Sequence, residues 1–529
     1  MRSFHYPGRS TVYARQGMVA TSHPSASLTG IEILKAGGNA VDAAIAIAAT
    51  LGVVEPAMTG VGGDCFALLH HPQKGMIALN ASGRAPKAAT TDWYARQGIT
   101  ALELQSPHAV TVPGAIDGWA RLLSDHGTMS FAKVLAPAIE FAQAGFVVAP
   151  RVAWDWARLE DKINVHAGAR QHLLKDGKPP REGSIMRFPA MARTLQAIAD
   201  GGRDAFYKGE IAQDLVDALT ALGGLHTMDD FAHQKASYVT PISARYGGLD
   251  IYELPPSNQG ITALIMLNML KHIDAYRGTA AQSALRYHIL LEVARQAYAA
   301  RDAFVADPDQ AEVPVEHMLS AGFAEALARR IDPKKRLAEL GPIPRPKGTD
   351  TVCFSVAGKD GMAVSFINSL YSGFGTAIVG AKSGVALHNR GQGFTLDPMH
   401  PNHIAPGKRP MHTLVPAFAM KDGAPHLAFG VMGAAFQPMG HVYVITGLAD
   451  HGLDPQEAID CPRIFFENDA LGLEHAVPAE VEAGLTALGH RCVRSDVPWG
   501  GGQAVMIDPA AGVLAGASDA RKDGIALGY

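Results

Sequence analysis

Cysteine is scarce in this chain. The 529 residues include only Cys65, Cys353, Cys461 and Cys492, which lie far apart and form no CxxC pair. In a chain this long, four scattered cysteines indicate reduced, buried or incidental thiols. We therefore expect reduced thiols and a cytoplasmic protein.

The chain also lacks an excess of charge and a long apolar run. Lys and Arg total 46 against 50 Asp and Glu, with no basic stripe or acidic tail. Binding to nucleic acid or to a membrane surface therefore has no support. The most apolar run, Ala43–Val54, is too short to span a bilayer, and the first residues contain no secretory apolar segment. We expect neither nucleic acid nor a membrane as partner.

Several catalytic and cofactor motifs are missing as well. No GxGxxG or P-loop spacing is present, which argues against a phosphate cradle, and no GxSxG elbow supports a serine hydrolase. His400, His403 and His412 have no spacing typical of a common metal site, and no cysteine or acidic residue joins them. We therefore predict no metal and no cofactor.

The residues that are present indicate a mixed α/β protein. Asn39 and Asp42 suit the start of a buried helix rich in Ala and Ile, which leads through a glycine-rich turn into strands at 64–69 and 75–81. From about Pro113 to Leu340 the pattern is mostly helical, most clearly over Ser283–Phe304. A stiff loop rich in Pro and Gly follows at 341–348, and strands with tight turns dominate after about residue 350.

Residues 351–370, TVCFSVAGKDGMAVSFINSL, predict a β-hairpin. Suppose that the loop is 359–361, with Gly361 in the left-handed conformation. The two residue numbers of each facing pair then add up to 720, so Thr351 faces Ser369. A two-residue loop would place Leu370 there instead. Either register leaves Ser369 within one residue of Thr351.

Thr351 has two interpretations. It is an ordinary residue at the start of a strand, or it becomes a nucleophile if the chain is cut between Asp350 and Thr351. The cut would free an α-amine, which titrates near pH ~8 and can take the proton from the threonine's own hydroxyl. The loop at 341–348 would present the bond, the same hydroxyl could make the cut, and Ser369 would orient the new amine.

Motifs along the whole chain resemble the γ-glutamyltranspeptidase family of N-terminal-nucleophile hydrolases. Their order and spacing carry the resemblance. They are GGNAVDAAIA (37–46), VVEPAMTGVGGD (53–64), VTVPGAIDGW (110–119), PPSNQG (255–260), the DTVCFSV start, FGTAIV (374–379), KRPMHTLVP (408–416), GVMG (430–433) and GASDARKDGIALGY (516–529).

The resemblance implies a four-layer αββα sandwich of the N-terminal-nucleophile hydrolase type, over residues 1–529 as one interlocked domain. It implies self-cleavage into a large chain, 1–350, and a small chain, 351–529, which stay associated. Thr351 would form an acyl-enzyme with an amide substrate, and water or an amine would take the acyl group. Backbone amides of Gly433 and Ala434 would hold the oxyanion.

The sequence departs from the family pattern in the acyl-binding pocket. The family's carboxylate-clamping arginine lies in a D-x-R-E-x-A-P stretch, but in NASGRAP (80–86) Arg84 lies two residues closer to Ala-Pro. Arg84 could be a clamp or a surface ion pair, and His412 a structural histidine or a substrate contact. The acidic residue that holds the substrate amine in the family aligns with Gly393. The aligned pocket positions are Tyr371, Asn389, Arg390, His412, Thr413 and Gln437.

These departures remove an acceptor for a cationic amine and add Arg390, which favours a short anionic acyl group. With Gln437 and His441, they resemble the branch that includes oxamate amidohydrolase and some acylases. We therefore predict an amidohydrolase for a small carboxylate-bearing amide. The alternatives are a true γ-glutamyltransferase or glutathione hydrolase, and an unprocessed binding protein without catalysis. The expected partners are the small-molecule amide and the two processed chains; homo-oligomerisation is left open.

Overall fold

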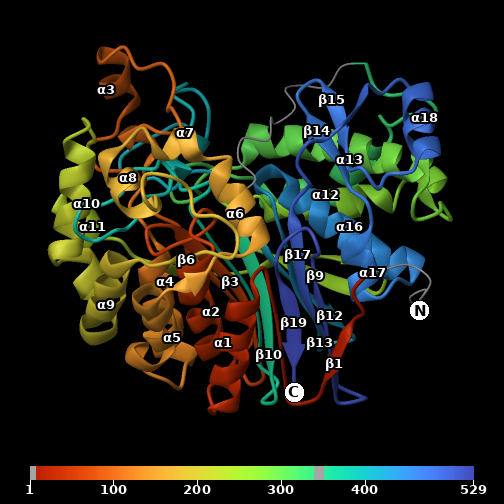
Figure 1. Ribbon diagram of the computed structural model, residues 1–529. Coiled ribbons are helices and arrows are strands. Elements are labelled where there is room, and N and C mark those ends of the chain that lie inside the picture. Colours follow the sequence, from red (N-terminus) through yellow and green to blue (C-terminus); the bar gives the residue numbers. More distant parts are fainter. Residues whose placement is uncertain (1–7, 339–350) are drawn as a thin grey trace.

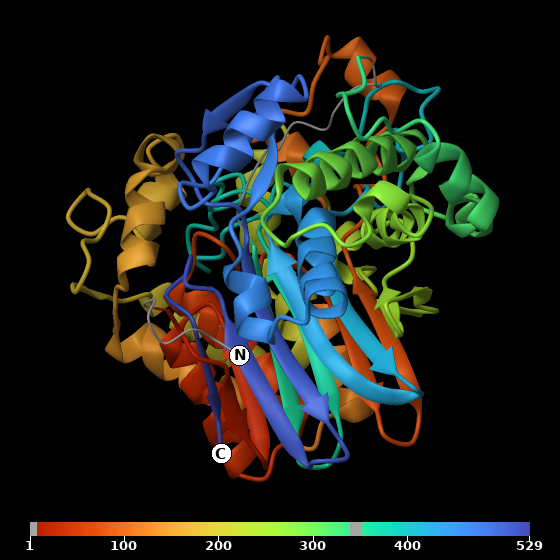
Figure 2. The same cartoon turned by 90° about the vertical axis from the view of Figure 1, so that its right-hand side faces the viewer.

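The computed structural model of the chain describes residues 8–338 and 351–529. The predicted loop 341–348 and Asp350 lie outside these residues. Two seven-stranded sheets form the centre of the molecule (Figures 1 and 2). In spatial order, the first contains β1 (Val12–Ala14), β18 (Val513–Ser518), β17 (Gly501–Asp508), β13 (Ala424–Met432), β12 (Pro416–Lys421), β9 (Leu249–Glu253) and β8 (Ile242–Tyr246). The second contains β19 (Ile525–Gly528), β2 (Gly17–Thr21), β10 (Val352–Gly358), β11 (Ala363–Ser369), β3 (Asp64–His71), β4 (Gly75–Ala81) and β7 (Ser237–Val239).

An apolar layer joins the facing sides of the two sheets. Phe66 and Ile367 of the second sheet belong to the same buried cluster as Phe418, Met432 and Val505 of the first. Burial of such side chains stabilises the sandwich by about 1.5–3 kcal/mol each. This inner layer fixes how the strands carrying Thr351 and Ser369 face the first sheet.

Helices cover the outer side of each sheet, which completes the predicted four-layer αββα sandwich. The second sheet is covered mainly by α1 (Pro24–Lys35), α2 (Ala40–Val54), α4 (Ala115–His126), α5 (Phe131–Ala144), α9 (Pro189–Tyr207) and α10 (Glu210–Thr220). The first is covered by α12 (Gly260–Leu270), α13 (Ala284–Phe304), α16 (Gln437–His451) and α17 (Pro455–Asp460). Figure 1 shows α1, α2 and α5 on one side of the strands and α16 and α17 on the other.

The remaining elements are shorter and peripheral. They are the helices α3 (Thr91–Arg96), α6 (Pro150–Ala157), α7 (Glu160–Ile163), α8 (Ala167–Leu173), α11 (Met228–Ala232), α14 (Val315–Leu319), α15 (Ala321–Ala328) and α18 (Ala479–Ala487), and the strands β5 (Phe146–Val147), β6 (Ile185–Met186), β14 (Ile464–Glu467), β15 (Ala470–Leu473) and β16 (Cys492–Arg494). Single 3₁₀ turns occur at η1 (Pro107–Ala109), η2 (Asp274–Tyr276), η3 (Arg390–Gly393) and η4 (Ala434–Phe436). No helix in the described ranges is both long and apolar enough to cross a membrane.

The local predictions for the early helix and for Ser283–Phe304 are confirmed. Asn39 caps α2, and Asp42 completes a capping box by accepting from the Asn39 amide. Ser283 caps α13, which begins one residue later. The expectation of a mostly helical stretch from Pro113 onward is wrong over residues 237–253, which form β7, β8 and β9.

Candidate active site around Thr351

The hairpin has the three-residue loop that brings Thr351 to Ser369. Strand β10 pairs with β11 from Val352↔Asn368 to Ala357↔Ala363, and the two residue numbers of every pair add up to 720. The Gly358 amide donates to the Met362 carbonyl at 2.9 Å, and Gly361 has a φ of 80°. The two hydroxyl oxygens, Thr351 Oγ1 and Ser369 Oγ, are 3.0 Å apart, and both residues are buried. The predicted register is confirmed.

Contacts between the sheets indicate what lies opposite Thr351. Ser355 Oγ donates to the Gln503 carbonyl, and two residues earlier Cys353 Sγ donates to the Gly501 carbonyl. In the first sheet Gln503 pairs with Gly430 and Gly501 with Met432. Because side chains two residues apart in a strand share a face, one more step brings Thr351 level with the turn that follows Met432.

That turn is the Gly433–Ala434 segment. Gly433 has a φ of 126° and Ala434 a φ of 47°, so both lie in the region that favours glycine. A side chain on Gly433 would come within 3.1 Å of the Gly500 Cα atom. The described residues provide no backbone or side-chain acceptor for the amides of Gly433 and Ala434. Left-handed backbone in a non-glycine residue is uncommon and is concentrated at functional sites.

Tyr371 links a buried arginine to Ser369. The backbone amide of Tyr371, which has a φ of 77°, donates to Ser369 Oγ at 2.8 Å. The guanidinium of Arg390 stacks on the Tyr371 ring, with its central carbon 3.6 Å from the ring centroid. Its Nη1 donates to Thr413 Oγ1 at 2.7 Å.

Arg390 is buried and forms no ion pair with the described residues. Only 1% of the residue is exposed, and neither Nε nor Nη2 has a hydrogen-bond acceptor among the described residues. Burial lowers the pKa of the guanidinium from its usual value. An unsatisfied buried charged donor costs free energy that a carboxylate ligand would recover.

Asp64 is a site residue that sequence analysis missed. It begins β3 directly opposite Ser369. Its Oδ1 accepts from the amides of Gly83 (2.9 Å) and Gly114 (3.0 Å), and its Oδ2 is 3.0 Å from His412 Nε2. Burial alone would raise its pKa, but His388, His412 and the Gly83 amide outweigh burial and lower it. The available signal was a lone carboxylate ending a glycine-rich motif at the start of an apolar strand.

His412 is held as a neutral histidine. The Leu414 amide donates to its Nδ1 at 3.2 Å, so the Nε2 proton faces Asp64. Burial lowers the pKa of His412 to about 4. The imidazole thus holds the Asp64 carboxylate in place, as expected for a structural histidine.

Gln259 connects two parts of the site and was also missed. Its Nε2 donates to the carbonyls of Thr413 (3.0 Å) and Ala434 (2.9 Å), while Arg301 donates to its Oε1 at 2.7 Å. The side chain therefore ties the Gly433–Ala434 turn to the residue that receives the Arg390 hydrogen bond. Its position in PPSNQG, directly before α12, was the only sequence signal.

The other predicted pocket residues differ in their surroundings. Arg84 is 30% exposed in its side chain and forms ion pairs with Asp309 (3.0 Å) and Asp307 (3.5 Å), which is the ion-pair alternative. The Asn389 amide group donates to Ser372 Oγ and to the carbonyls of Leu104 and Gly375. The Oε1 of Gln437 accepts from the Val415 amide, whereas its buried Nε2 has no partner among the described residues.

Comparison with known proteins decides the family. The model of the family described as Gamma-glutamyltranspeptidase matches residues 26–529. The chain belongs to the γ-glutamyltranspeptidase family. It is 38% identical to the glutathione hydrolase-like YwrD proenzyme of Bacillus subtilis, over 98% of this chain and 99% of that protein. It is 34% identical to the oxamate amidohydrolase proenzyme of Klebsiella pneumoniae, over 98% of this chain and 100% of that protein.

Solved structures agree with this family. The cephalosporin acylase from Bacillus halodurans has 38% sequence identity and a TM-score of 0.92, covering 100% of this chain and 99% of that one. The resemblance drawn from the motifs is therefore confirmed, together with the αββα fold. As a member of the γ-glutamyltranspeptidase family, the chain is an amide hydrolase or acyltransferase of the self-processing type.

One histidine cluster in the described ranges has the donor types of a metal site. His288, Glu292 and His490 place ligand atoms within 4.8 Å of one another. His288 Nδ1 lies 2.8 Å from His490 Nε2, its Nε2 lies 2.8 Å from the Asp332 carbonyl, and Arg295 neutralises Glu292 at 2.9 Å. Internal hydrogen bonds thus occupy the histidine nitrogens that would bind a metal ion. The positive charge of Arg295 also disfavours a cation beside Glu292.

Proposed function

We propose that this protein cleaves itself between Asp350 and Thr351 and then hydrolyses a small carboxylate-bearing amide, such as oxamate, through an acyl-enzyme on Thr351. The products would be a large chain, 1–350, and a small chain, 351–529, that remain associated. The proposal includes a cytoplasmic location, which the four free cysteines support.

In the processing step, Thr351 Oγ1 attacks the carbonyl carbon of Asp350. The C–N bond breaks as the C–O bond forms, and the freed amine takes a proton. Water then hydrolyses the ester, giving a carboxylate on Asp350 and a free α-amine on Thr351. Ser369 Oγ, 3.0 Å from Thr351 Oγ1, supports this step as a hydrogen-bond partner of the nucleophile.

In turnover, the α-amine takes the hydroxyl proton while Oγ1 attacks the substrate carbonyl. Amides of Gly433 and Ala434 would stabilise the oxyanion, a contribution worth roughly 10²–10³-fold in kcat for one such donor. The proton passes to the leaving nitrogen, which departs as ammonia or an amine. Water then releases the acid and restores the hydroxyl.

The observation that carries the substrate proposal is Arg390. A guanidinium that is fully buried, stacked on Tyr371 and left with two unpartnered nitrogens matches a carboxylate with two acceptor oxygens. Thr413 fixes its third nitrogen, so little side-chain entropy is lost on binding. Tyr371 connects the arginine directly to Ser369.

The Asp64 carboxylate, which begins the strand paired with Ser369, does not favour a zwitterionic substrate. Asp64 already accepts from two backbone amides and from His412. A substrate ammonium would have to share the carboxylate with those three donors. The relative named glutathione hydrolase-like is the observation in favour of the second candidate, a γ-glutamyl hydrolase or transferase.

Intact-mass spectra and a substrate comparison test the proposal. Purified protein should give two masses, for 1–350 and 351–529, and should release ammonia from oxamate faster than it releases p-nitroaniline from γ-glutamyl-p-nitroanilide. A single mass for 1–529 after long incubation would support the binding-protein alternative. Faster turnover of the γ-glutamyl compound would support the second candidate.

Two arginine variants test the clamp. Arg390→Met should raise KM for oxamate about 10- to 100-fold, because a charge-assisted contact to the carboxylate is lost. Arg84→Met is the matched control, since it removes an arginine that is already paired with the exposed Asp309 and the buried Asp307. An equal KM in both variants would contradict the role of Arg390.

A further inference from the structure

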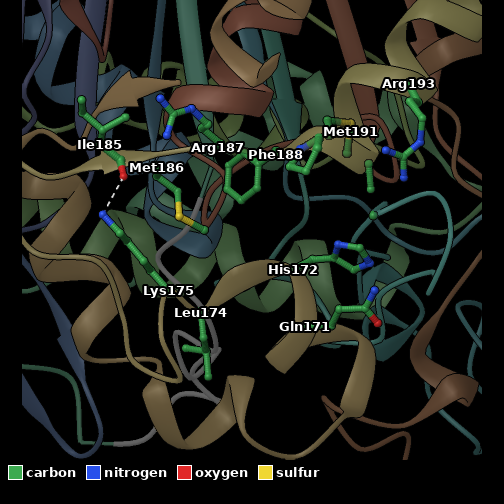
Figure 3. A pocket seen from close by; sticks show the side chains of 13 residues that line it. Gln171, His172, Leu174, Lys175, Ile185, Met186, Arg187, Phe188, Met191 and Arg193 are labelled. Carbon is green, nitrogen blue, oxygen red and sulfur yellow. Dashed lines mark hydrogen bonds between the residues drawn. The ribbon is translucent and has the colours of Figure 1, made fainter. Parts of the chain in front are cut away.

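A separate cavity of about 610 Å³ lies between α8, β6 and the first turn of α9 (Figure 3). It shares no lining residue with the Thr351 site. Its size is within the range of cavities that bind small molecules. Neither the catalytic proposal nor the family motifs account for it.

The wall of this cavity is cationic. Figure 3 shows Arg187 and Arg193 along its upper edge and Lys175 and His172 below them. None of its 13 lining residues is an aspartate or a glutamate. The chain as a whole has a formal net charge of −4, so this concentration of positive charge is local.

The hydrogen bonds found for these basic side chains go to backbone carbonyls. Lys175 Nζ donates to Ile185 at 3.1 Å, Arg187 Nε donates to Ala144 at 2.9 Å, and His172 Nε2 lies 3.0 Å from the Ala381 oxygen. These contacts orient the side chains without neutralising their charge. An anionic ligand would supply the missing negative charge.

The floor of the cavity is apolar and rigid. Phe188 and Met186 are buried, and Leu174 and Met191 are partly buried. The Phe188 ring packs against Trp156 and Phe146, with centroids 6.1 and 5.8 Å away. A bare inorganic anion would leave this apolar surface unused, whereas a ligand with an apolar body would cover it.

We propose that this cavity binds an amphipathic organic anion, with its carboxylate or phosphate group among Lys175, Arg187 and Arg193 and its apolar body against Phe188 and Met191. The proposal does not depend on the function assigned to Thr351. Gly384, in the wall, belongs to the segment that leads to Asn389 and Arg390, so an occupied cavity would contact that segment.

Calorimetric titration of the full-length protein with 2-naphthoate tests this site. The triple variant Lys175→Gln, Arg187→Gln, Arg193→Gln should bind at least tenfold more weakly than the wild type. The double variant Lys178→Gln, Arg181→Gln is the matched control, because it removes exposed cations outside the lining. The control should bind like the wild type.

Three further measurements separate this site from others. Arg390→Met should leave 2-naphthoate affinity unchanged, which distinguishes the cavity from the proposed active site. The neutral 2-naphthalenemethanol and inorganic phosphate should each bind at least tenfold more weakly than 2-naphthoate. Met191→Glu, which adds a carboxylate to the wall, should also weaken binding while circular dichroism stays unchanged. Equal affinity in the triple variant, or for the neutral analogue, would overturn the proposal.

Discussion

At the scale of single residues, the proposed chemistry depends on two hydroxyls that the hairpin brings together in a buried setting. Thr351 and Ser369 have Oγ atoms 3.0 Å apart, and Ser369 also accepts from the Tyr371 amide. Such an arrangement orients both oxygens before any substrate arrives. Precise placement of a nucleophile is worth several kcal/mol of barrier in general.

Substitution of these hydroxyls should separate processing from folding. We expect Thr351→Ala to remain a single 529-residue chain and Thr351→Ser to be processed, because serine keeps a hydroxyl nucleophile. Ser369→Ala should slow processing at least tenfold. Intact-mass spectra over time measure all three.

Ser365→Ala is the control for Ser369→Ala. Ser365 is buried on the same face of β11 and donates to the Phe429 carbonyl, so its loss removes a comparable hydrogen bond away from Thr351. Processing at the wild-type rate is expected in this control. Equal slowing in both serine variants would mean that hairpin stability, and not the Ser369 hydroxyl, governs the cut.

Glu55 should make folding stability depend on pH. It is fully buried and accepts from Ser22 Oγ at 2.5 Å. Burial raises its pKa to about 7, although Lys522 and Ser22 act in the opposite direction. Between pH 4.5 and 7 the folded state therefore retains a proton that the unfolded state loses, so its contribution to stability falls as pH rises, by up to about 3 kcal/mol.

Glu55→Gln should remove the loss of stability that Glu55 causes as the pH rises. In the single-chain Thr351→Ala background, urea unfolding should show the stability of Glu55→Gln relative to its parent increasing from pH 4.5 to pH 8. Glu32→Gln, at an exposed position of α1, is the control and should show no such trend. A constant difference between Glu55→Gln and its parent would contradict the raised pKa.

At the scale of elements, local signals predicted structure where they were strong. The capping residues of α2 and α13 and the Asp-Gly turn of the β10–β11 hairpin each act within a few residues. The β8–β9 hairpin had a signal too, since Gly247 and Gly248, both with positive φ, separate two alternating runs. It was missed because its strands have only five residues each and lie between helices.

Contacts between distant elements could not be predicted in this way. Gln259 precedes α12, yet its side chain meets carbonyls at Thr413 and Ala434, and Asp64 meets His412. Such pairs are more than 150 residues apart in the sequence, and only the tertiary fold brings them together. Sequence analysis therefore predicted candidate site residues such as Thr351 and Ser369, and it missed Asp64 and Gln259, whose contacts come from distant parts of the chain.

Gln259 is expected to position the Gly433–Ala434 turn. Gln259→Leu removes its donors to Ala434 and Thr413 and the acceptor of Arg301, so the turn loses its support. We expect kcat to fall about 10- to 100-fold, with a smaller change in KM, because the oxyanion donors act mainly in the transition state. Steady-state kinetics on the processed enzyme measure both constants.

Gln296→Leu provides the matched control. Gln296 is a buried glutamine of α13 that donates to the Leu327 carbonyl at 2.8 Å, outside the site. It should lower thermal stability without changing kcat. If both glutamine variants lowered kcat equally, a general loss of rigidity would explain the result better than the position of the turn.

At the scale of the whole molecule, each sheet contains strands from both sides of the 350/351 bond, and some of them are direct neighbours. In the second sheet, β10 lies between β2 and β11, and β2 itself lies between β19 and β10. In the first sheet, β1 pairs with β18 and β9 with β12. A cut at this bond therefore separates no domain from another.

Because strands from the two processed chains pair with one another in both sheets, we predict that the chains stay together until the fold itself is lost. Separating them would break the β10–β2, β19–β2, β1–β18 and β12–β9 ladders and expose the apolar layer between the sheets. Size-exclusion chromatography in native buffer should give one peak containing both chains, at the same volume as unprocessed Thr351→Ala. In 6 M guanidinium chloride the two chains should elute separately. Two peaks in native buffer would contradict the interlocked arrangement. Coelution of the wild type and Thr351→Ala would show that the cut changes the connectivity of the chain and leaves its packing intact.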